Sequence, residues 1–201
     1  TGSIVNVCPG TTTTYTVTAS STTPCGAVSA TDVVTVTVDV MPIGGAATIF
    51  PDHICNGDST DVTLTGYDGD IQWQLSTTSL GPWIDINGAT AAVYNTLPIT
   101  SVLYYRAIVS NACGVDTSTI ATVYPEPFPI VGFNHSNICI YESAQFNNTS
   151  SISSGNIISW FWDFGDGSTS SSQSPTYSYG NPGTYNVTLF ATSDYGCVDS
   201  I

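Results

Sequence analysis

At 201 residues and 41% hydrophobic content, the chain is long enough for one large domain or for two domains of ordinary size. Only 8% of the residues are charged, the net charge is −14, and Arg106 is the sole Lys or Arg residue. A single cation cannot neutralise a run of phosphates, so the composition excludes nucleic-acid binding through counterion release and attraction to anionic lipid.

The composition also predicts the fold class and the compartment. Thr, Val, Ile and Tyr are abundant, which favours strands over helices, so we expect an all-β protein. Six cysteines in a chain of this kind indicate an oxidising, extracellular setting. The apolar runs are too short to cross a bilayer, so no direct membrane insertion is expected. The chain begins at Thr1 without a signal peptide, and we expect it to be a piece of a longer polypeptide that carries the secretion signal or anchor.

Residues 1–41 contain two strand signals, Thr11 to Ala19 and Thr31 to Val40. Both alternate apolar and polar residues with a period of two, which is typical of a half-buried strand. Pro24 and Gly26 lie between them and predict a β-hairpin. Because two strands alone are marginally stable in water, this segment is expected to be the closing part of a larger unit.

Two boundaries divide the rest of the chain. Met41 to Gly45 combines a proline with two glycines, and Tyr124 to Pro129 has prolines at alternate positions, which favour a short stiff spacer. The expected domains are therefore residues 1–41, 42–125 and 126–201.

The second and third of these units share a layout of cysteines. Cys55 and Cys113 are 58 positions apart, and so are Cys139 and Cys197. In each unit the first cysteine precedes a polar turn and a tryptophan-bearing strand, and the second follows a long Tyr-rich strand. Equal spacing of this kind indicates an internal repeat. It predicts the disulfides Cys55–Cys113 and Cys139–Cys197, one inside each unit.

The partners of Cys8 and Cys25 stay open at this point. One alignment matches Cys25-Gly26 with Cys113-Gly114, which leaves the partner of Cys25 upstream of the chain. A rival alignment matches Cys8 with Cys55 and pairs Cys8 with Cys25. An extended strand between these two cysteines would hold them beyond disulfide reach, so we prefer the first alignment.

An aromatic strand runs into an acidic turn at Trp162-Asp163-Phe164-Gly165-Asp166-Gly167. This run resembles the signature of the polycystic kidney disease (PKD) domain, an immunoglobulin-like β-sandwich. Asn181 to Val187 resembles the strand entry of that family, in which Tyr185 would form a tyrosine corner. Residues 46–124 resemble a different immunoglobulin-like repeat, and residues 9–38 resemble part of a third. The resemblance implies tandem immunoglobulin-like β-sandwiches, the last one PKD-like.

This mixture of repeats is similar to the tandem arrays of very large Bacteroidota cell-surface adhesins, including gliding-motility adhesins exported by type IX secretion. It implies a non-enzymatic stalk, a mechanical spacer on the cell surface that presents a distal adhesive tip. The implied partners are neighbouring repeats, with surface glycans or other cell-surface proteins as further candidates. The alternatives are a subunit of a surface filament, or a carbohydrate-binding accessory region of a secreted polysaccharide-degrading enzyme, for which Trp83, Tyr67 and Tyr94 would stack on sugars.

Few residues carry candidate chemistry. Asp163 and Asp166 are candidate Ca²⁺ ligands, but side chains that cap a turn are the favoured explanation. No other cofactor and no catalytic residue is predicted. His53 and His135 lie near cysteines that are expected to pair with each other, so no zinc site is expected. Ser59 and Ser200 each follow an Asp in triplets that resemble the Bacteroidota O-glycosylation motif, and both are candidate glycan sites.

Overall fold

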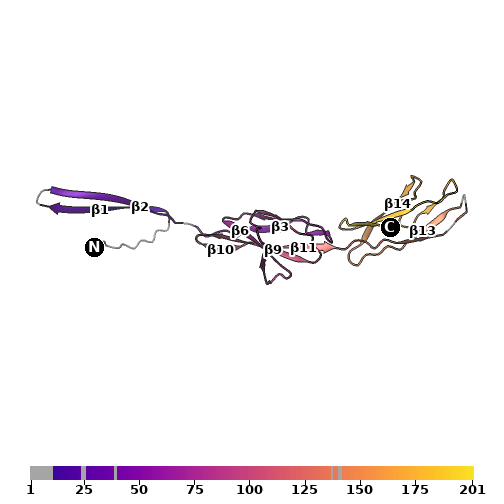
Figure 1. Ribbon diagram of the computed structural model, residues 1–201, viewed down its shortest axis with the longest axis horizontal. Coiled ribbons are helices and arrows are strands. Elements are labelled where there is room, and N and C mark those ends of the chain that lie inside the picture. The colour runs from indigo at the N-terminus through magenta and orange to yellow at the C-terminus, as the bar shows by residue number, and fades with distance from the viewer. Residues whose placement is uncertain (1–10, 24–25, 39, 137, 140–141) are drawn as a thin grey trace.

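A computed structural model describes residues 11–23, 26–38, 40–136, 138–139 and 142–201. These residues form strands and connecting turns, without a helix, arranged as a hairpin and two β-sandwich units in a row (Figure 1). The all-β, immunoglobulin-like fold class is therefore confirmed. Within the described ranges there is also no helix of the length and hydropathy needed to cross a lipid bilayer.

The first part is a long β-hairpin of β1 (Thr13–Thr23) and β2 (Gly26–Val36), paired antiparallel along their whole length. The predicted hairpin is confirmed. Both strands extend further toward the turn than the sequence predicts, because β1 ends at Thr23 and not at Ala19, and β2 begins at Gly26 and not at Thr31. No other strand of the described residues pairs with it, and Val17, Val33 and Val34 are all more than half exposed. Cys8 and Cys25 lie outside the described residues.

The middle unit is a sandwich of two sheets. The smaller sheet contains β3 (Ala46–Ile49), β5 (Asp61–Thr65) and β8 (Val93–Asn95). The larger sheet has the order β4 (His53–Cys55), β11 (Ala121–Glu126), β9 (Leu103–Asn111), β6 (Asp70–Ser76) and β7 (Ile84–Asp85), and β10 (Gly114–Thr117) also pairs with β9.

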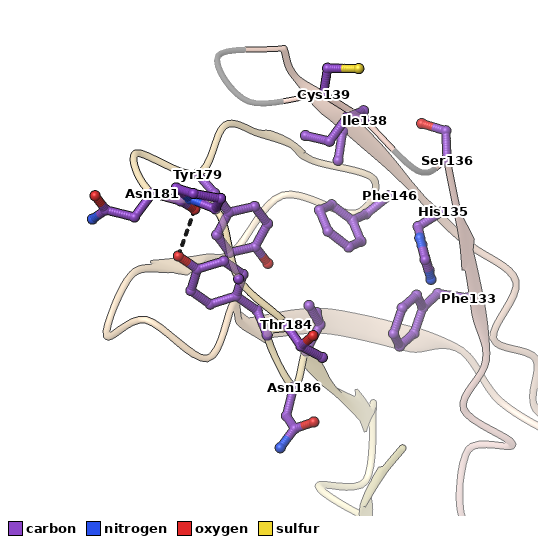
Figure 2. A pocket seen from close by; sticks show the side chains of 15 residues that line it. Phe133, His135, Ser136, Ile138, Cys139, Phe146, Tyr179, Asn181, Thr184 and Asn186 are labelled. Atoms are coloured by element: carbon purple, nitrogen blue, oxygen red, sulfur yellow. Dashed lines mark hydrogen bonds between the residues drawn. The ribbon is translucent and has the colours of Figure 1, made fainter.

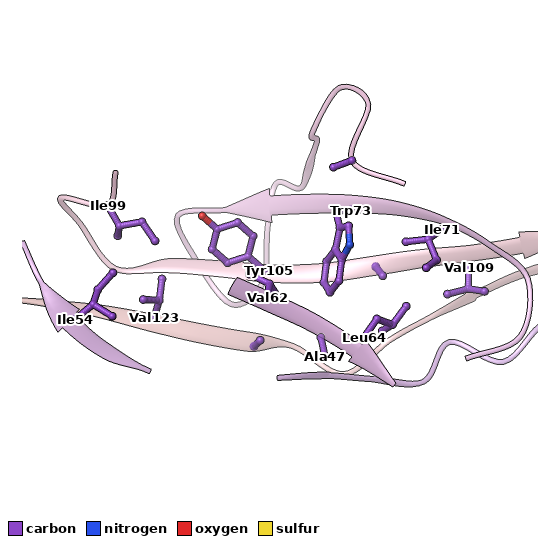
Figure 3. Close-up of a cluster of buried hydrophobic side chains, with 13 residues drawn as sticks. Ala47, Ile54, Val62, Leu64, Ile71, Trp73, Ile99, Tyr105, Val109 and Val123 are labelled. Atoms are coloured by element: carbon purple, nitrogen blue, oxygen red, sulfur yellow. The ribbon is translucent and has the colours of Figure 1, made fainter. Parts of the chain in front are cut away.

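Trp73 is the centre of the core of this unit (Figure 3). Buried and outward-facing residues alternate from Asp70 to Gln74 of β6, as the period-two pattern requires, and Trp73 is fully buried. Its indole N–H donates to the carbonyl of Ala91 at 2.8 Å, so the buried polar group is satisfied. Val62 and Leu64 pack from the other sheet.

Strand β11 holds the larger sheet together because it changes partner half-way. Ala121 to Val123 pair antiparallel with β9, whereas Tyr124 to Glu126 pair parallel with β4. The segment between Cys113 and the joint thus contains two strands, β10 and β11. The expected spacer Tyr124 to Pro129 is also half strand, so only residues 127–129 connect the units, and Pro129 is itself fully buried.

The C-terminal unit has the same two-sheet construction. One sheet contains β12 (Phe133–His135), β13 (Ala144–Asn148) and β16 (Thr176–Tyr177). The other has the order β15 (Thr169–Ser170), β14 (Ile157–Asp163), β17 (Thr188–Ser193) and β18 (Val198–Ser200). The fully buried Trp162 donates its indole N–H to the carbonyl of Ser172 at 2.9 Å, as Trp73 does to Ala91 in the middle unit.

Candidate functional site

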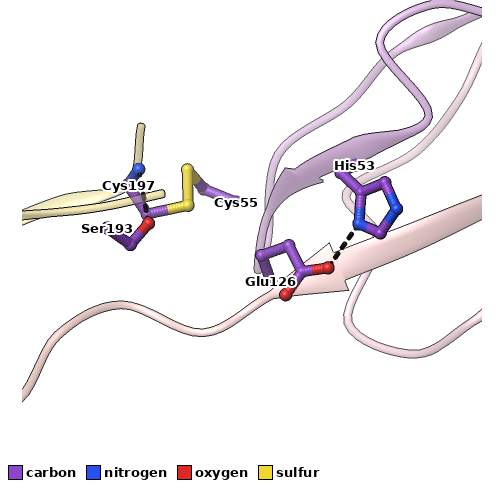
Figure 4. Close-up of a disulfide and its surroundings, with 5 residues drawn as sticks. All are labelled: His53, Cys55, Glu126, Ser193 and Cys197. Carbon is purple, nitrogen blue, oxygen red and sulfur yellow. Dashed lines mark hydrogen bonds and ion pairs between the residues drawn. A yellow bond between two sulfur atoms is a disulfide. The ribbon is translucent and has the colours of Figure 1, made fainter. Parts of the chain in front are cut away.

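A disulfide between Cys55 and Cys197 crosses the joint between the two sandwich units (Figure 4). Cys55 ends β4 of the middle unit, and Cys197 lies in the turn before β18 of the C-terminal unit. Their Cα atoms are 5.5 Å apart, although 142 positions separate them in the sequence. The bond therefore fixes one unit to the next.

The predicted pairs Cys55–Cys113 and Cys139–Cys197 are wrong, because the two cysteines of the middle unit lie at opposite ends of the sandwich. Cys55 pairs in register with Glu126, where the chain leaves the unit. Cys113 follows β9 at the entry end, where the Asn111 side chain donates to the carbonyl of Val40 at 3.0 Å. The nine residues of β9 span about 30 Å, far beyond disulfide reach. Cys113 and Cys139 are exposed free thiols.

Aromatic stacking reinforces the joint around His53. The imidazole of His53 lies between two nearly parallel tyrosine rings, with centroids 4.9 Å from Tyr124 of its own unit and 4.3 Å from Tyr195 of the next. His53 Nδ1 is hydrogen-bonded to Oε1 of the nearly buried Glu126 (Figure 4). Stacking across the joint needs one particular orientation of the two units, so these contacts restrict bending.

The acidic turn of the PKD-like motif caps its own backbone. Asp163 accepts from the amide of Gly165 at 2.9 Å, and Asp166 accepts from the amide of Ser168 at 3.0 Å and from the Tyr177 hydroxyl at 2.7 Å. Gly165 has a φ of 77°, and a Cβ there would lie 2.4 Å from the carbonyl oxygen of Asn186. Asp163 and Asp166 thus cap the turn, while Ca²⁺ binding by this pair is tested by none of these contacts. The described residues contain no group of three or more His, Cys, Asp or Glu placed to hold a metal.

The Tyr177 hydroxyl, followed by the Ser168 amide, holds the pKa of Asp166 below its ordinary value of 3.8. We expect Tyr177→Phe to raise this pKa toward 3.8, because the largest stabiliser of the carboxylate is lost. A depressed folded-state pKa stabilises the fold above the unfolded-state pKa, and this contribution is lost as the pH falls through the folded-state value. Carboxyl NMR titration measures the shift. Tyr67→Phe in the middle unit is the control and should leave Asp166 unchanged.

Trp83, the candidate sugar platform, is covered on one face. The guanidinium of Arg106 lies 4.3 Å from the centroid of its ring, and Arg106 Nε donates to Gln74 Oε1 at 2.8 Å. Gln74 in turn donates to Asp85 at 2.8 Å. Tyr94 is half-buried and packs on the core, whereas Tyr67 is 37% exposed. The guanidinium of Arg106, the chain's sole Lys or Arg residue, thus occupies the position that a sugar would take on this face of Trp83.

Ser59 and Ser200 are both exposed, Ser59 in the loop that precedes β5 and Ser200 in β18. Their O-glycosylation stays a prediction.

An open groove of about 700 Å³ lies at one end of the C-terminal unit (Figure 2). Phe133, Phe146 and Tyr179 point into it, between the segment that carries Ile138 and Cys139 on one side and residues 181–187 on the other. The Tyr185 hydroxyl donates to the carbonyl of Asn181 at 2.9 Å, which is the expected tyrosine corner. Sequence reasoning did not identify the groove, because its lining comes from segments that are distant in the sequence.

Two family descriptions match the two sandwich units. Residues 127–201 match the PKD domain, and residues 46–127 match a domain of unknown function, DUF8696.

Among curated proteins, the pre-pro-metalloprotease PrtV of Vibrio cholerae is 52% identical over 58 residues, which are 29% of this chain and 6% of that protein. A microbial collagenase of Vibrio alginolyticus is 30% identical over 128 residues, which are 63% of this chain and 14% of that protein. The matches thus span only a small part of these relatives.

The solved PKD1 domain of the Vibrio cholerae metalloprotease PrtV is 43% identical to this chain, of which it covers 37%, with 89% of its own length matched and a TM-score of 0.35. The family match coincides with the unit that is built around Trp162 and the Asp163 to Gly167 turn. Residues 127–201 of this chain therefore resemble a PKD domain.

Proposed function

We propose that the chain is a non-enzymatic, extracellular accessory region of a larger protease, in which it works as a stiff spacer. The observation that carries the proposal is the Cys55–Cys197 disulfide between consecutive units. With the stack of Tyr124, His53 and Tyr195 beside it, this bond makes a joint that holds two sandwiches in one orientation. Units joined only by a short linker would move freely relative to each other.

The choice of a protease rests on the comparisons. The PKD domain resembles segments of a metalloprotease and a collagenase. In this chain it would serve as a stiff spacer beside a protease catalytic domain. The disulfide supports an extracellular location, because disulfides persist in oxidising compartments. The coverage of Trp83 by Arg106 makes the carbohydrate-binding alternative less attractive.

A stalk segment of a cell-surface adhesin is the second candidate, and the row of β units in Figure 1 favours it. Gliding motility and type IX secretion would follow only from that candidate. The sequence of the complete polypeptide separates the two. A protease catalytic domain in the same polypeptide supports the accessory region, whereas a long series of further repeats without one supports the stalk.

The stiffness of the joint is directly measurable, because the exposed thiols of Cys113 and Cys139 lie in different units. In a chain with Cys8 and Cys25 replaced by Ser, spin labels on these two thiols should give a narrow distance distribution by pulsed EPR. We expect Cys55→Ser with Cys197→Ser to broaden it, because the covalent restraint on orientation is gone. Equal widths in the two proteins would contradict the spacer proposal.

A further inference from the structure

The chain contains two Asn-Gly pairs, Asn56-Gly57 and Asn87-Gly88, and both lie in tight turns of the middle unit. Each pair occupies the two central positions of a β-turn, one over residues 55–58 and the other over residues 86–89. The amide-to-carbonyl hydrogen bonds that close these turns are 2.9 Å and 3.1 Å long. Both asparagines and both glycines are exposed, and the glycines have φ values of 93° and 75°. The two pairs are therefore alike in sequence, turn and exposure.

The two pairs differ in what holds the amide of the glycine. The N–H of Gly57 donates to the carbonyl of Ile99 at 2.7 Å. The N–H of Gly88 has no acceptor among the residues that the structure describes, and the side chain of Asn87 has no hydrogen-bond partner among them either. One glycine amide is thus fixed, whereas the other can approach the side chain of its own asparagine.

We propose that Asn87 is a deamidation site, at which the chain modifies itself without an enzyme. The amide nitrogen of Gly88 attacks the side-chain carbonyl carbon of Asn87, and the side-chain NH₂ group leaves as ammonia with the proton that the amide gives up. Water then opens the resulting five-membered imide at either carbonyl, which yields aspartate or isoaspartate. Glycine favours ring closure because it has no Cβ to crowd the attacking nitrogen. At Asn56 the same attack first requires loss of the hydrogen bond from Gly57 to Ile99.

The isoaspartate product would change the edge of the larger sheet. The turn over residues 86–89 is bonded to Trp73 on both sides. The amide of Ile86 donates to the carbonyl of Trp73, and the amide of Trp73 donates to the carbonyl of Ala89, each at 2.9 Å. Isoaspartate carries the backbone through the former side chain, which adds one carbon atom between Ile86 and Ala89. The two hydrogen bonds can then no longer form together, so β7 loosens from β6. This modification does not depend on the proposed spacer function.

The folded, oxidised full chain in mildly alkaline buffer tests the site, because the two Asn-Gly pairs react side by side in one molecule. Peptide mapping by mass spectrometry follows the replacement of NH₂ by OH at each asparagine. We expect Asn87 to react about tenfold faster than Asn56, because the hydrogen bond of Gly57 must open before its ring can close. In the chain unfolded with guanidinium after reduction, the two pairs should react at equal rates. Equal rates in the folded chain would overturn the proposal, and so would a preference for Asn87 that persists in the unfolded chain.

Hydrogen exchange at the amides of Ile86 and Trp73 tests the consequence for the sheet. The deamidated chain, separated by anion exchange, should exchange faster at both amides than the fresh chain. The matched control is Asn87→Asp, which gains the same charge but keeps the length of the backbone, and it should exchange like the fresh chain. Unchanged exchange in the deamidated chain, or equally fast exchange in the control, would contradict the loosening of β7 by the longer backbone.

Discussion

When the chain is pulled from its two ends, reduction of its disulfide should release about 480 Å of additional contour length. The Cys55–Cys197 bond encloses a segment 142 positions long, which contains most of both sandwich units. In the oxidised chain the force passes through the bond and bypasses this segment. In the reduced chain both units carry the load, and each residue that unravels adds about 3.4 Å.

Single-molecule stretching of oxidised and reduced chains measures the difference. A chain with Cys113→Ser is the control, and it should behave as the wild type because Cys113 is a free thiol. If each unit instead had its own crosslink, as the sequence spacing predicted, reduction would release two smaller increments of contour length, one for each unit. An identical extension with and without reducing agent would show that the bond does not carry the force.

The core of each unit could be predicted from the sequence because local pattern determines it. Trp73 and Trp162 occupy inward positions of alternating strands, and both are fully buried. The Asp163 to Gly167 turn could be predicted for a similar reason. Asp163 accepts from the amide of Gly165 and Asp166 from the amide of Ser168, each two residues further on, so these hydrogen bonds depend on the local sequence alone.

The cysteine pairing could not be predicted because equal spacing identifies equivalent positions without showing which of them meet. Cys55 is equivalent to Cys139, and Cys113 to Cys197, as the spacing indicated. The bond, however, joins the first position of one unit to the second position of the next. Each cysteine lies at one end of an elongated sandwich, and units in a row bring opposite ends together. The free thiols of Cys113 and Cys139 are the two positions of this pattern that the bond leaves unused.

The stack around His53 needed the three-dimensional structure for the same reason. Tyr195 is 142 positions from His53 in the sequence and reaches it only because the disulfide two residues further on fixes the turn of the next unit. The only signal in the sequence was the position of His53 two residues before Cys55. That spacing predicted no site at His53, and the aromatic contact with Tyr195 is visible only in the structure.

Removal of the crosslink should lower the stability of both units together. A closed loop of this length stabilises the folded state by about 5 kcal/mol on the chain-entropy model. Folded domains have a stability of roughly 5 to 15 kcal/mol in total, so the loss is large. We expect Cys55→Ser with Cys197→Ser to lower the Tm of each unit by about 10 °C, because the loss is shared between two domains of fewer than 100 residues.

Differential scanning calorimetry under oxidising conditions tests this expectation. The matched control is Cys113→Ser with Cys139→Ser, which makes the same two substitutions at exposed thiols of the same two units. The control should melt like the wild type, whereas the first variant should show two separate transitions, since its units no longer restrict each other's unfolded state. A control that loses as much stability as the first variant would show that serine at these positions, and not the bond between Cys55 and Cys197, determines the result.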